Sequence, residues 1–361
     1  MPVDSEVKHY YGSIRDPVDE RDYLFRPSLE RVAAVPSSVD LTTVAKTEVF
    51  AQAMNDCTAN AAIGLFMWLQ QAVAPPAFTG SRMAEYKWGL DIDGATGDFG
   101  MFPRTAMQVM YQIGVAHDAL WPYYLGTYPD DGSPMPNPNW NTVPPSNVTA
   151  DASNNKATNY FRCDDSTNIE NTINYMRVAI GGSRVVSGVT IPGVPVMFST
   201  GVGDSFSVDG GLTGEIPVPT QSELNAGHSI IAIGYDDAHG CSDGSSGAFI
   251  IKNSWSASYG SGGYAWMPYN YLRVVDSLWS GYCDAWAIGL ESQISTKPSI
   301  QIPSWAKKFP SMSEIDITNY LTLKHDGQPT PGQHSVEIVP VDGTSHVNAH
   351  VRVREKQPRR E

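Results

Sequence analysis

Three short segments, far apart in the chain, carry side chains that could perform thiol chemistry together. They are residues 52–61, 225–231 and 250–255. A cysteine thiol is a weak nucleophile until a base removes its proton, and an imidazole does this well. The first segment holds Cys57 and the second holds His228. The pattern therefore predicts a nucleophilic site in which these two residues meet.

Cys57 stands at the start of an expected helix. Residues 57–69 form a mostly apolar block that ends before a pair of prolines, and Asn55 or Asp56 can serve as its N-cap. The free N–H groups and partial positive charge of a helix N-terminus favour a thiolate. Taken alone, Cys57 could equally be a buried structural cysteine.

Two strand-like segments position the other candidates. His228 begins the apolar run 228–235, and Asn253 follows the run 249–252. The Asn253 amide oxygen can accept the proton of one ring nitrogen of His228, which leaves the other nitrogen facing the sulfur. Trp255 can lie over that hydrogen bond and exclude water. The alternatives are a histidine that caps a strand and a tryptophan that only fills the core.

Gln52 is the candidate oxyanion donor. Its side-chain amide and the backbone N–H of Cys57 can both bind the oxygen of a tetrahedral intermediate. The predicted catalytic residues are therefore Cys57, His228 and Asn253, with Gln52 in the oxyanion hole and Trp255 in support.

These motifs, in this order, resemble the papain-like cysteine peptidases. The similarity is to a bacterial and viral-type subgroup whose nucleophile motif reads Cys-Thr-Ala-Asn-Ala, here residues 57–61. It spans about residues 10–290 and includes the segments 15–23, 120–123, 211–217 and 263–269. The resemblance implies an α+β fold of two subdomains, one helical and one antiparallel and β-barrel-like, with a cleft between them.

The same resemblance implies a cysteine endopeptidase that hydrolyses peptide bonds through a Cys-His pair and a thioester. It implies a peptide or protein substrate and neither a cofactor nor a metal. Two other functions stay open. The site could transfer the acyl group to an amine instead of water, or the chain could bind peptides without catalysis.

Three departures from the family pattern bear on the site. Gln52 lies one residue closer to Cys57 than is usual, so Asn55 is an alternative oxyanion donor. Asp56 stands where a small serine is usual, and its charge would raise the pKa of the neighbouring thiol. His228 follows Cys57 by 171 residues, against about 130–150 in well-known members; a polar loop at residues 129–150 can absorb the excess.

Composition and charge limit the function classes. The net charge of −14 argues against nucleic acid as a ligand, because phosphate binding needs clustered basic residues. Residues 1–6 are polar, and no apolar run is long enough for a membrane span. The sequence thus predicts a cytoplasmic protein without a membrane partner. None of the four cysteines forms a CxxC pair, and we expect all four to be reduced.

The chain divides into three predicted parts. Residues 1–35 read as an N-terminal arm, either a strap packed on the domain or a pro-like segment that covers the cleft. Residues 36–291 form the peptidase domain, and residues 292–361 a linker and small β extension. Further helices are expected at 104–113 and 166–180. Strands are expected at 184–190, 194–200, 228–235, 248–252, 264–267, 317–324, 336–339 and 347–353.

Overall fold

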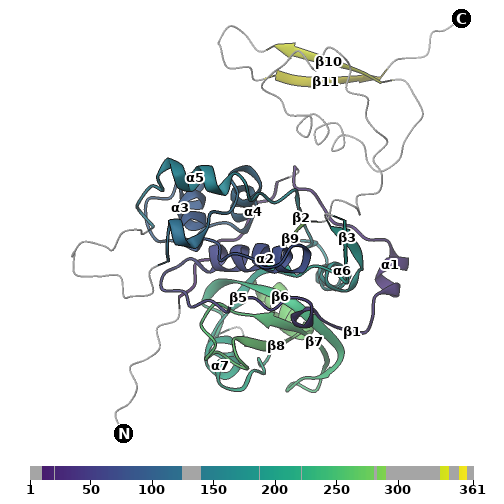
Figure 1. Ribbon diagram of the computed structural model, residues 1–361. Coiled ribbons are helices and arrows are strands. Elements are labelled where there is room, and N and C mark those ends of the chain that lie inside the picture. The colour runs from purple at the N-terminus through teal and green to yellow at the C-terminus, as the bar shows by residue number, and fades with distance from the viewer. Residues whose placement is uncertain are drawn as a thin grey trace, which may run out of the picture. The chain divides into compact units, whose positions relative to one another are not determined.

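The computed structural model describes most of the chain (Figure 1). The described residues are 10–19, 21–123, 140–186, 188–220, 222–279, 283–289, 334–340 and 349–355. The chain separates into two compact units, residues 1–297 and residues 298–361. Each unit is described by itself.

Eight α-helices are described, all in the first unit. The longest is α2, and α2, α3 and α4 pack against one another. Their bounds are α1 (Leu29–Ala34), α2 (Cys57–Val73), α3 (Arg82–Asp93), α4 (Pro103–Gln112), α5 (Ser146–Ala152), α6 (Ile169–Gly181), α7 (Gly210–Thr213) and α8 (Tyr269–Trp279).

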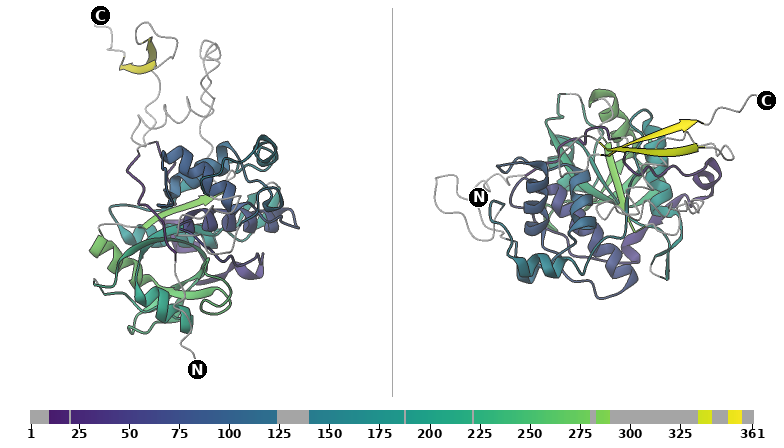
Figure 2. Two further views of the ribbon diagram at one scale, coloured as in Figure 1. Left: turned by 90° about the vertical axis from the view of Figure 1, so that its left-hand side faces the viewer. Right: turned by 90° about the horizontal axis from the view of Figure 1, so that it is seen from above.

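The main sheet of the first unit is antiparallel. Its strands follow the order β2-β9-β5-β6-β7-β8, and β1 pairs with β6. The described sheet is curved (Figure 2). Its end strands β2 and β8 are not paired with each other, so it does not close into a barrel. A separate hairpin joins β3 and β4. The bounds are β1 (Ser38–Asp40), β2 (Tyr160–Arg162), β3 (Arg184–Val186), β4 (Val189–Ile191), β5 (Val196–Val202), β6 (Ala226–Gly240), β7 (Ser246–Lys252), β8 (Tyr264–Pro268) and β9 (Cys283–Ile288).

Helix α2 lies directly against the sheet. Its first twelve residues are all buried, as expected for a helix that is apolar nearly all round. Gly64 lets the helix approach β6, since a Cβ at this position would stand 2.8 Å from the Ile231 side chain. At the far end the Trp68 indole donates a 3.2 Å hydrogen bond to the Leu41 carbonyl. The first residue of α2 is thereby held at a defined place beside β6.

The expected helices and strands of the first unit are present with one exception. The single strand expected at 184–190 is wrong, because the chain turns at Gly188, whose φ is +80°, and β3 and β4 pair there as a hairpin. The structure also adds other elements. Helix α5 overlaps the end of the segment 129–150, which the sequence analysis assigned to a loop. Val148 and Ala152 are four residues apart and fully buried against Trp88 and Val109. This packing favours a helix in the segment, because side chains four residues apart lie on one helical face. The preceding residues 124–139 lie outside the described part.

Helix α3 and strand β9 were not expected from the sequence. In α3 the buried residues include Arg82, Glu85 and Lys87, so the apolar period is broken. In β9 all six residues are buried, so no alternation marks it as a strand. Both elements depend on tertiary partners that a local pattern does not reveal.

In the second unit the structure describes one antiparallel hairpin. Strand β10 (His334–Pro340) pairs with β11 (Ala349–Glu355), and Val336 lies opposite Val353. These strands overlap the expected segments 336–339 and 347–353. The third expected segment, 317–324, and the linker before it lie outside the described residues.

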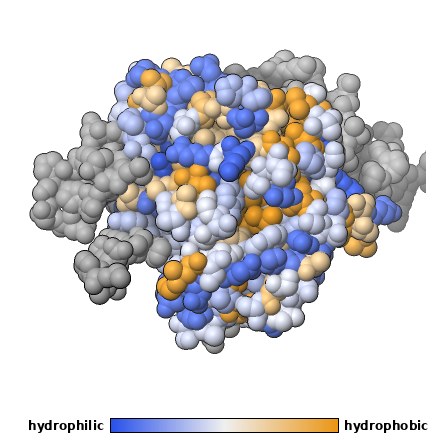
Figure 3. All heavy atoms as spheres, turned by 60° about the horizontal axis from the view of Figure 1, so that its bottom comes forward, coloured by the Kyte–Doolittle hydropathy of each residue, from blue (hydrophilic) through white to orange (hydrophobic). Residues whose placement is uncertain are grey.

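On the face shown in Figure 3, hydrophobic residues form several groups among hydrophilic ones. The most exposed ones, Val18, Leu29 and Leu212, belong to different segments. Among the described residues, no helix has the length and apolar character needed to cross a membrane.

Two leucines test the packing of α2. Leu65 in α2 is 1% exposed and Leu212 in α7 is 80% exposed. We expect Leu65→Ala to lower the free energy of unfolding by about 2–5 kcal/mol, because it leaves a cavity in the core. Leu212→Ala should change it by less than about 0.5 kcal/mol. Urea unfolding of both variants gives the comparison, and similar losses in the two would contradict the described burial.

Candidate active site

The first turn of α2 meets the start of β6. The backbone N–H of Ser229 in β6 donates to the Cys57 sulfur over 3.4 Å. His228 is the neighbour of Ser229, so the chain brings the imidazole to the same end of α2. Cys57 and His228 are both 0% exposed. The two residues that the sequence paired therefore lie at one junction between helix and sheet.

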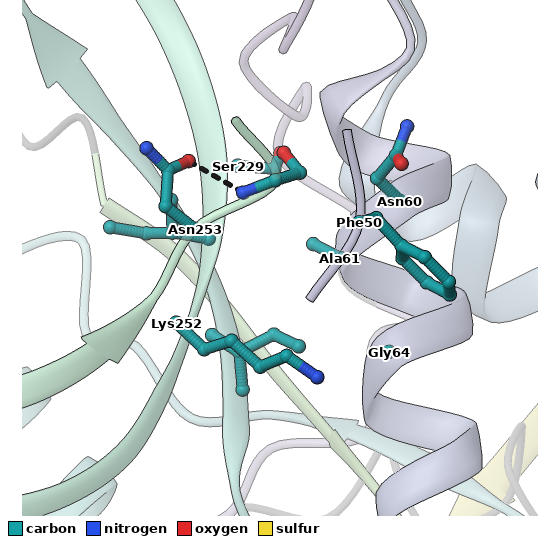
Figure 4. Close-up of a pocket in the computed structure, with 10 residues that line it drawn as sticks. Phe50, Asn60, Ala61, Gly64, Ser229, Lys252 and Asn253 are labelled. Carbon is teal, nitrogen blue, oxygen red and sulfur yellow. Dashed lines mark hydrogen bonds between the residues drawn. The ribbon is translucent and has the colours of Figure 1, made fainter. Parts of the chain in front are cut away.

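The His228 ring is held by the segment that follows β7. Its Nε2 lies 2.8 Å from the Asn253 amide oxygen. The pairing of Ile231 with Lys252 aligns the two strands so that Asn253 reaches the ring. The same amide oxygen accepts the N–H of Ser254 at 2.8 Å, which fixes the orientation of the amide (Figure 4). The Trp255 ring stacks on the imidazole at 4.7 Å between centroids, as expected for a cover over the hydrogen bond.

Gln52 also lies at this junction. Its backbone N–H donates to the Ser254 carbonyl at 2.8 Å, and its side-chain oxygen accepts the Ser254 hydroxyl at 2.5 Å. Its Nε2 donates to the Tyr10 carbonyl at 2.9 Å. The alternative donor, Asn55, is turned away and hydrogen-bonds Asp98 instead. Despite the short loop, Gln52 rather than Asn55 faces this region.

The cavity in Figure 4 lies behind the site, between α2 and the sheet. It has a volume of about 10 Å³ and is lined by Asn60, Gly64, Lys252 and Asn253, among others. This space suits one water molecule and no substrate side chain. Lys252 is buried, and its Nζ donates to the Thr47 hydroxyl at 2.6 Å. Burial lowers the pKa of Lys252 to about 8.

An N-terminal strap, residues 10–16, covers the junction. The Tyr10 carbonyl accepts hydrogen bonds from Gln52 Nε2 and, at 3.1 Å, from the Trp255 indole. The Gly12 carbonyl accepts the N–H of Met101 at 3.0 Å, and the N–H of Ser13 donates to the Gly227 carbonyl at 3.1 Å. The strap thus contacts both walls beside Cys57 and His228.

Gly12 is required where the strap crosses the loop that precedes α2. Its φ of +116° is a conformation that residues with a side chain rarely adopt. A Cβ there would stand 1.9 Å from the Asn55 carbonyl oxygen. Only glycine therefore permits the strap to lie this close to the loop before Cys57.

A buried ionic cluster ties the strap to the domain. The Asp16 side chain accepts the N–H of Arg104 at 3.0 Å and the indole N–H of Trp286 at 2.9 Å. Its own N–H donates to Asp284 at 2.8 Å. Farther along, Asp22 receives two hydrogen bonds from the Arg104 guanidinium, at 2.7 and 2.6 Å. Burial raises the pKa of Asp16 to about 6 and that of Asp284 to about 8.

The electrostatics of Cys57 differ from the expectation based on its helix position. Burial raises the pKa of the thiol to about 12, although the hydrogen bond from Ser229 lowers it, and the charge of Asp56 raises it further. Desolvation is the largest contribution, and it disfavours the charged form of the sulfur in the described structure.

Asp56 occupies the N-cap position of α2 without capping it, because its side chain makes no cap hydrogen bond. It is fully buried, which raises the pKa of its carboxyl to about 7, while the charge of Arg82 lowers it. Arg82 is held between the rings of Phe50 and Tyr123, at 4.1 and 3.8 Å. The neutral form of this unusual acid is thus favoured below about pH 7.

Sequence reasoning missed a chain of hydroxyl groups behind the sulfur. Ser13 donates to Ser199 at 2.8 Å, Ser199 lies 2.7 Å from Ser229, and Ser229 lies 2.8 Å from Thr58. Thr58 is in turn 4.0 Å from the Cys57 sulfur. Small hydroxyl residues are common, and only the strand register and the strap bring these four together. No local signal would have found them.

All four cysteines, which lie in the described residues, are free thiols. Within the same residues, no group of three His, Cys, Asp or Glu side chains could hold a metal ion. At the end of α3, the Asp93 carboxylate is already hydrogen-bonded within the protein, because it accepts the Thr105 hydroxyl at 2.5 Å.

Comparison with known proteins identifies the family. The family model described as papain family cysteine protease matches residues 94–276, just over half of the chain. The chain belongs to the papain family of cysteine proteases. The matched range contains His228 and Asn253, whereas Cys57 and Gln52 precede it.

Relatives extend the similarity to the N-terminal half. The chain is similar to the crystal structure of xylellain, a cysteine protease from Xylella fastidiosa. The TM-score is 0.63 at 28% identity, over 79% of this chain and 99% of xylellain. It is 24% identical to an uncharacterized peptidase C1-like protein of Acanthamoeba polyphaga mimivirus, over 74% of this chain and 84% of that protein.

A more distant structure shows the fold alone. A procathepsin B of Trypanosoma congolense has a TM-score of 0.52 at 13% identity, over 77% of this chain and 85% of that protein. The α+β papain fold expected from the sequence is therefore confirmed, as is its assignment as a thiol protease. The barrel-like description expected from the sequence needs one qualification, because the described sheet has an open edge and is not a closed barrel.

The buried Asp56 predicts a pH effect on stability. Its pKa is raised on folding, from 3.8 to about 7, so its neutral form is the one that the folded state accepts. The stability from this neutral carboxyl is fully present below about pH 4, falls as the pH rises between about 4 and 7, and is lost above about pH 7. We expect Asp56→Asn to remove that loss, so that its melting temperature exceeds that of the wild type more at pH 8 than at pH 5.

The exposed Asp209 supplies the control. Asp209→Asn should follow the wild type at both pH values, since this carboxyl is exposed to solvent. A difference between Asp56→Asn and wild type that is the same at pH 5 and pH 8 would contradict the assigned protonation state.

Proposed function

We propose that this chain is an endopeptidase in which Cys57 is the nucleophile and His228 its base. The observation that carries the proposal is the 2.8 Å bond from His228 to Asn253, made where the neighbouring Ser229 N–H contacts the Cys57 sulfur. Asn253 holds the ring by one nitrogen, and the other nitrogen is left for the thiol proton.

The reaction follows the chemistry of an activated thiol. His228 takes the proton of Cys57, and the sulfur attacks the carbonyl carbon of the substrate to give a tetrahedral oxyanion. Gln52 Nε2 and the N–H of Cys57 stabilise that oxygen. His228 then protonates the leaving amine, and water, deprotonated by the same imidazole, hydrolyses the thioester. Trp255 protects the imidazole–amide bond from water.

We further propose that the strap is a pro-like segment that must leave before substrate binds. Cys57 and His228 are fully buried beneath it, and the Tyr10 carbonyl takes the hydrogen of Gln52 that the oxyanion would need. Strap release would also readmit water and lower the cost of forming the thiolate. The pairing of Arg104 with Asp22 supplies a second attachment that can persist after residues 10–14 have moved.

The nucleophile is tested by replacing cysteines one at a time. Cys57→Ala should lower casein hydrolysis by at least about a thousandfold and abolish labelling by an epoxide inhibitor, because no other group can form the thioester. Cys241→Ser is the matched control, since Cys241 is the more accessible thiol, at the turn between β6 and β7. Loss of activity in Cys241→Ser with full activity in Cys57→Ala would overturn the assignment.

The role of the strap is tested by Gly12→Val, which cannot seat against Asn55. A clash with backbone costs well above 1.4 kcal/mol, so we expect alkylation of Cys57 and turnover to rise about tenfold or more. Gly94→Val is the control, because Gly94 also has a positive φ, of +68°, but has no atom within 4 Å of an added Cβ.

Mass spectrometry of the labelled protein measures the alkylation rate at Cys57 in both variants. Equal rates in wild type, Gly12→Val and Gly94→Val would show that the strap does not limit access. A similar rise in Gly12→Val and Gly94→Val would attribute the effect to general loosening of the fold.

A further inference from the structure

Asp98 holds the loop that connects the two predicted oxyanion donors. Gln52 supplies one donor and the backbone of Cys57 the other, so the path of residues 53–56 sets how the two are placed. The Asp98 carboxylate accepts the backbone N–H of Asn55, at 3.1 Å to Oδ1 and 3.2 Å to Oδ2. It also accepts the Asn55 side-chain amide at 3.3 Å, and the Asp98 carbonyl accepts that amide at 2.9 Å. Backbone and side chain of one loop residue are thus bound to Asp98 together.

The residues on either side of Asn55 have anchors of their own. The N–H of Ala53 donates to the Tyr123 hydroxyl at 2.9 Å. The Asp56 carbonyl accepts the side-chain amide and the N–H of Asn60, both at 3.0 Å, and is thereby fixed to α2. The middle of the loop is therefore the part that Asp98 holds. If Asp98 lost its carboxylate, the Asn55 N–H would lose this acceptor and the loop could take another path.

Asp98 is itself held by a tyrosine of α3. The Tyr86 side chain is fully buried, and its hydroxyl donates to Asp98 Oδ1 at 2.7 Å. The same hydroxyl accepts the N–H of Gly100 at 3.0 Å, so its orientation is fixed from both sides. Hydrogen bonds to a carboxylate are also shorter and stronger than those between neutral groups. A rigid helix therefore positions the group that binds Asn55.

The same network holds both edges of the gap that the strap crosses. A Cβ on Gly12 would stand 1.9 Å from the Asn55 carbonyl oxygen, and a Cβ on Gly100 would stand 1.9 Å from the Gly12 carbonyl oxygen. Asp98 binds the Asn55 edge, and Tyr86 joins Asp98 to the Gly100 edge. The oxyanion loop is thus tied across this gap to the segment that follows α3.

We propose that Asp98 is a positioning residue for catalysis, which clamps Asn55 so that Gln52 Nε2 and the Cys57 N–H are held toward the oxygen of the tetrahedral intermediate. The inference rests on the proposed function and adds a residue that acts through the loop without touching the substrate. Donors stabilise an oxyanion best when their positions are set before the reaction, because turning them into place uses part of the energy that they supply.

The main experiment compares two reactions of the same thiol in full-length Asp98→Ala. Hydrolysis of a peptide amide passes through a tetrahedral oxyanion, whereas alkylation of Cys57 by a peptidyl epoxide of the same sequence does not. Both reactions need the strap displaced and the thiol ionised, so dividing kcat/KM by the alkylation rate constant leaves the contribution of the oxyanion donors. We expect this ratio to fall about tenfold or more, a part of the about hundred- to thousandfold loss on removing one donor. A ratio equal to that of the wild type would overturn the positioning role.

Asp93→Ala is the matched control. Asp93 is also a partly buried carboxylate that accepts a hydroxyl and a backbone N–H, from Thr105 at 2.5 Å and Phe102 at 3.2 Å. These contacts join α3 to the start of α4 and leave the oxyanion loop untouched, so the ratio should stay that of the wild type. Melting temperatures show whether each variant folds. If Asp98→Ala does not fold, Asp98→Asn replaces it, and the ratio should fall about threefold or more because one acceptor becomes a donor.

A double variant tests whether Asp98 acts through the oxyanion donors. The loss in Gln52→Ala, Asp98→Ala should be smaller than the product of the two single losses, because a donor that has been removed cannot be misplaced. Losses that multiply would show that Asp98 acts independently of Gln52, and would overturn the proposed route.

Hydrogen exchange keeps the test independent of turnover. The amide of Asn55 should exchange about tenfold or more faster in Asp98→Ala, because it has lost its acceptor, and at the wild-type rate in Asp93→Ala. Unchanged exchange over residues 52–57 in Asp98→Ala would overturn the clamp even if peptides are cut. A wild type that neither cuts the peptide nor reacts with the epoxide, with faster exchange in Asp98→Ala, would instead contradict the proposed function and support the clamp.

Discussion

The contact between the first turn of α2 and the start of β6 is the constraint on which the site depends. Gly64 sets the distance between helix and sheet, and the Ser229 N–H meets the sulfur of Cys57 across it. The register of β6 with β7 then brings Asn253 to His228. A shift of one residue in that register would turn every side chain of β7 to the opposite face and remove the amide from the ring.

Burial and reactivity oppose each other at this site. A nucleophilic thiol needs its charged form, whereas the covered site raises the pKa of Cys57 to about 12 and that of Asp56 to about 7. Both shifts arise chiefly from desolvation and not from the residues' sequence neighbours. On the proposed function, release of the strap would change the solvent around the sulfur, and so would act on its ionisation as well as on access to it.

The strap also explains why the ionic cluster of Asp16, Asp22, Arg104 and Asp284 is buried. Buried charges are costly unless each has partners. Here Arg104 and the Trp286 indole bind Asp22 and Asp16, and the Arg162 guanidinium binds Asp284 and Asp22. The cluster places the strap at one end, and the glycine at position 12 lets it descend to the nucleophile at the other. Tyr11, the residue before Gly12, lies edge-on to the rings of His228 and Trp255.

The sequence by itself determined the family, the α+β class and the candidates Cys57, His228, Asn253, Gln52 and Trp255, because nucleophile, base and amide stand in motifs of recognisable local form. It also determined the start of α2 and most strands of the sheet, through their apolar runs. Only the tertiary structure decided that Asn55 turns to Asp98, that α3 and α5 are helices, and that four hydroxyl groups line up behind the sulfur. The path of residues 10–16 over the junction between α2 and β6 was likewise decided by the tertiary structure. The physical reason is that these features depend on burial and on contacts between distant segments, and neither is encoded in any short stretch of the chain.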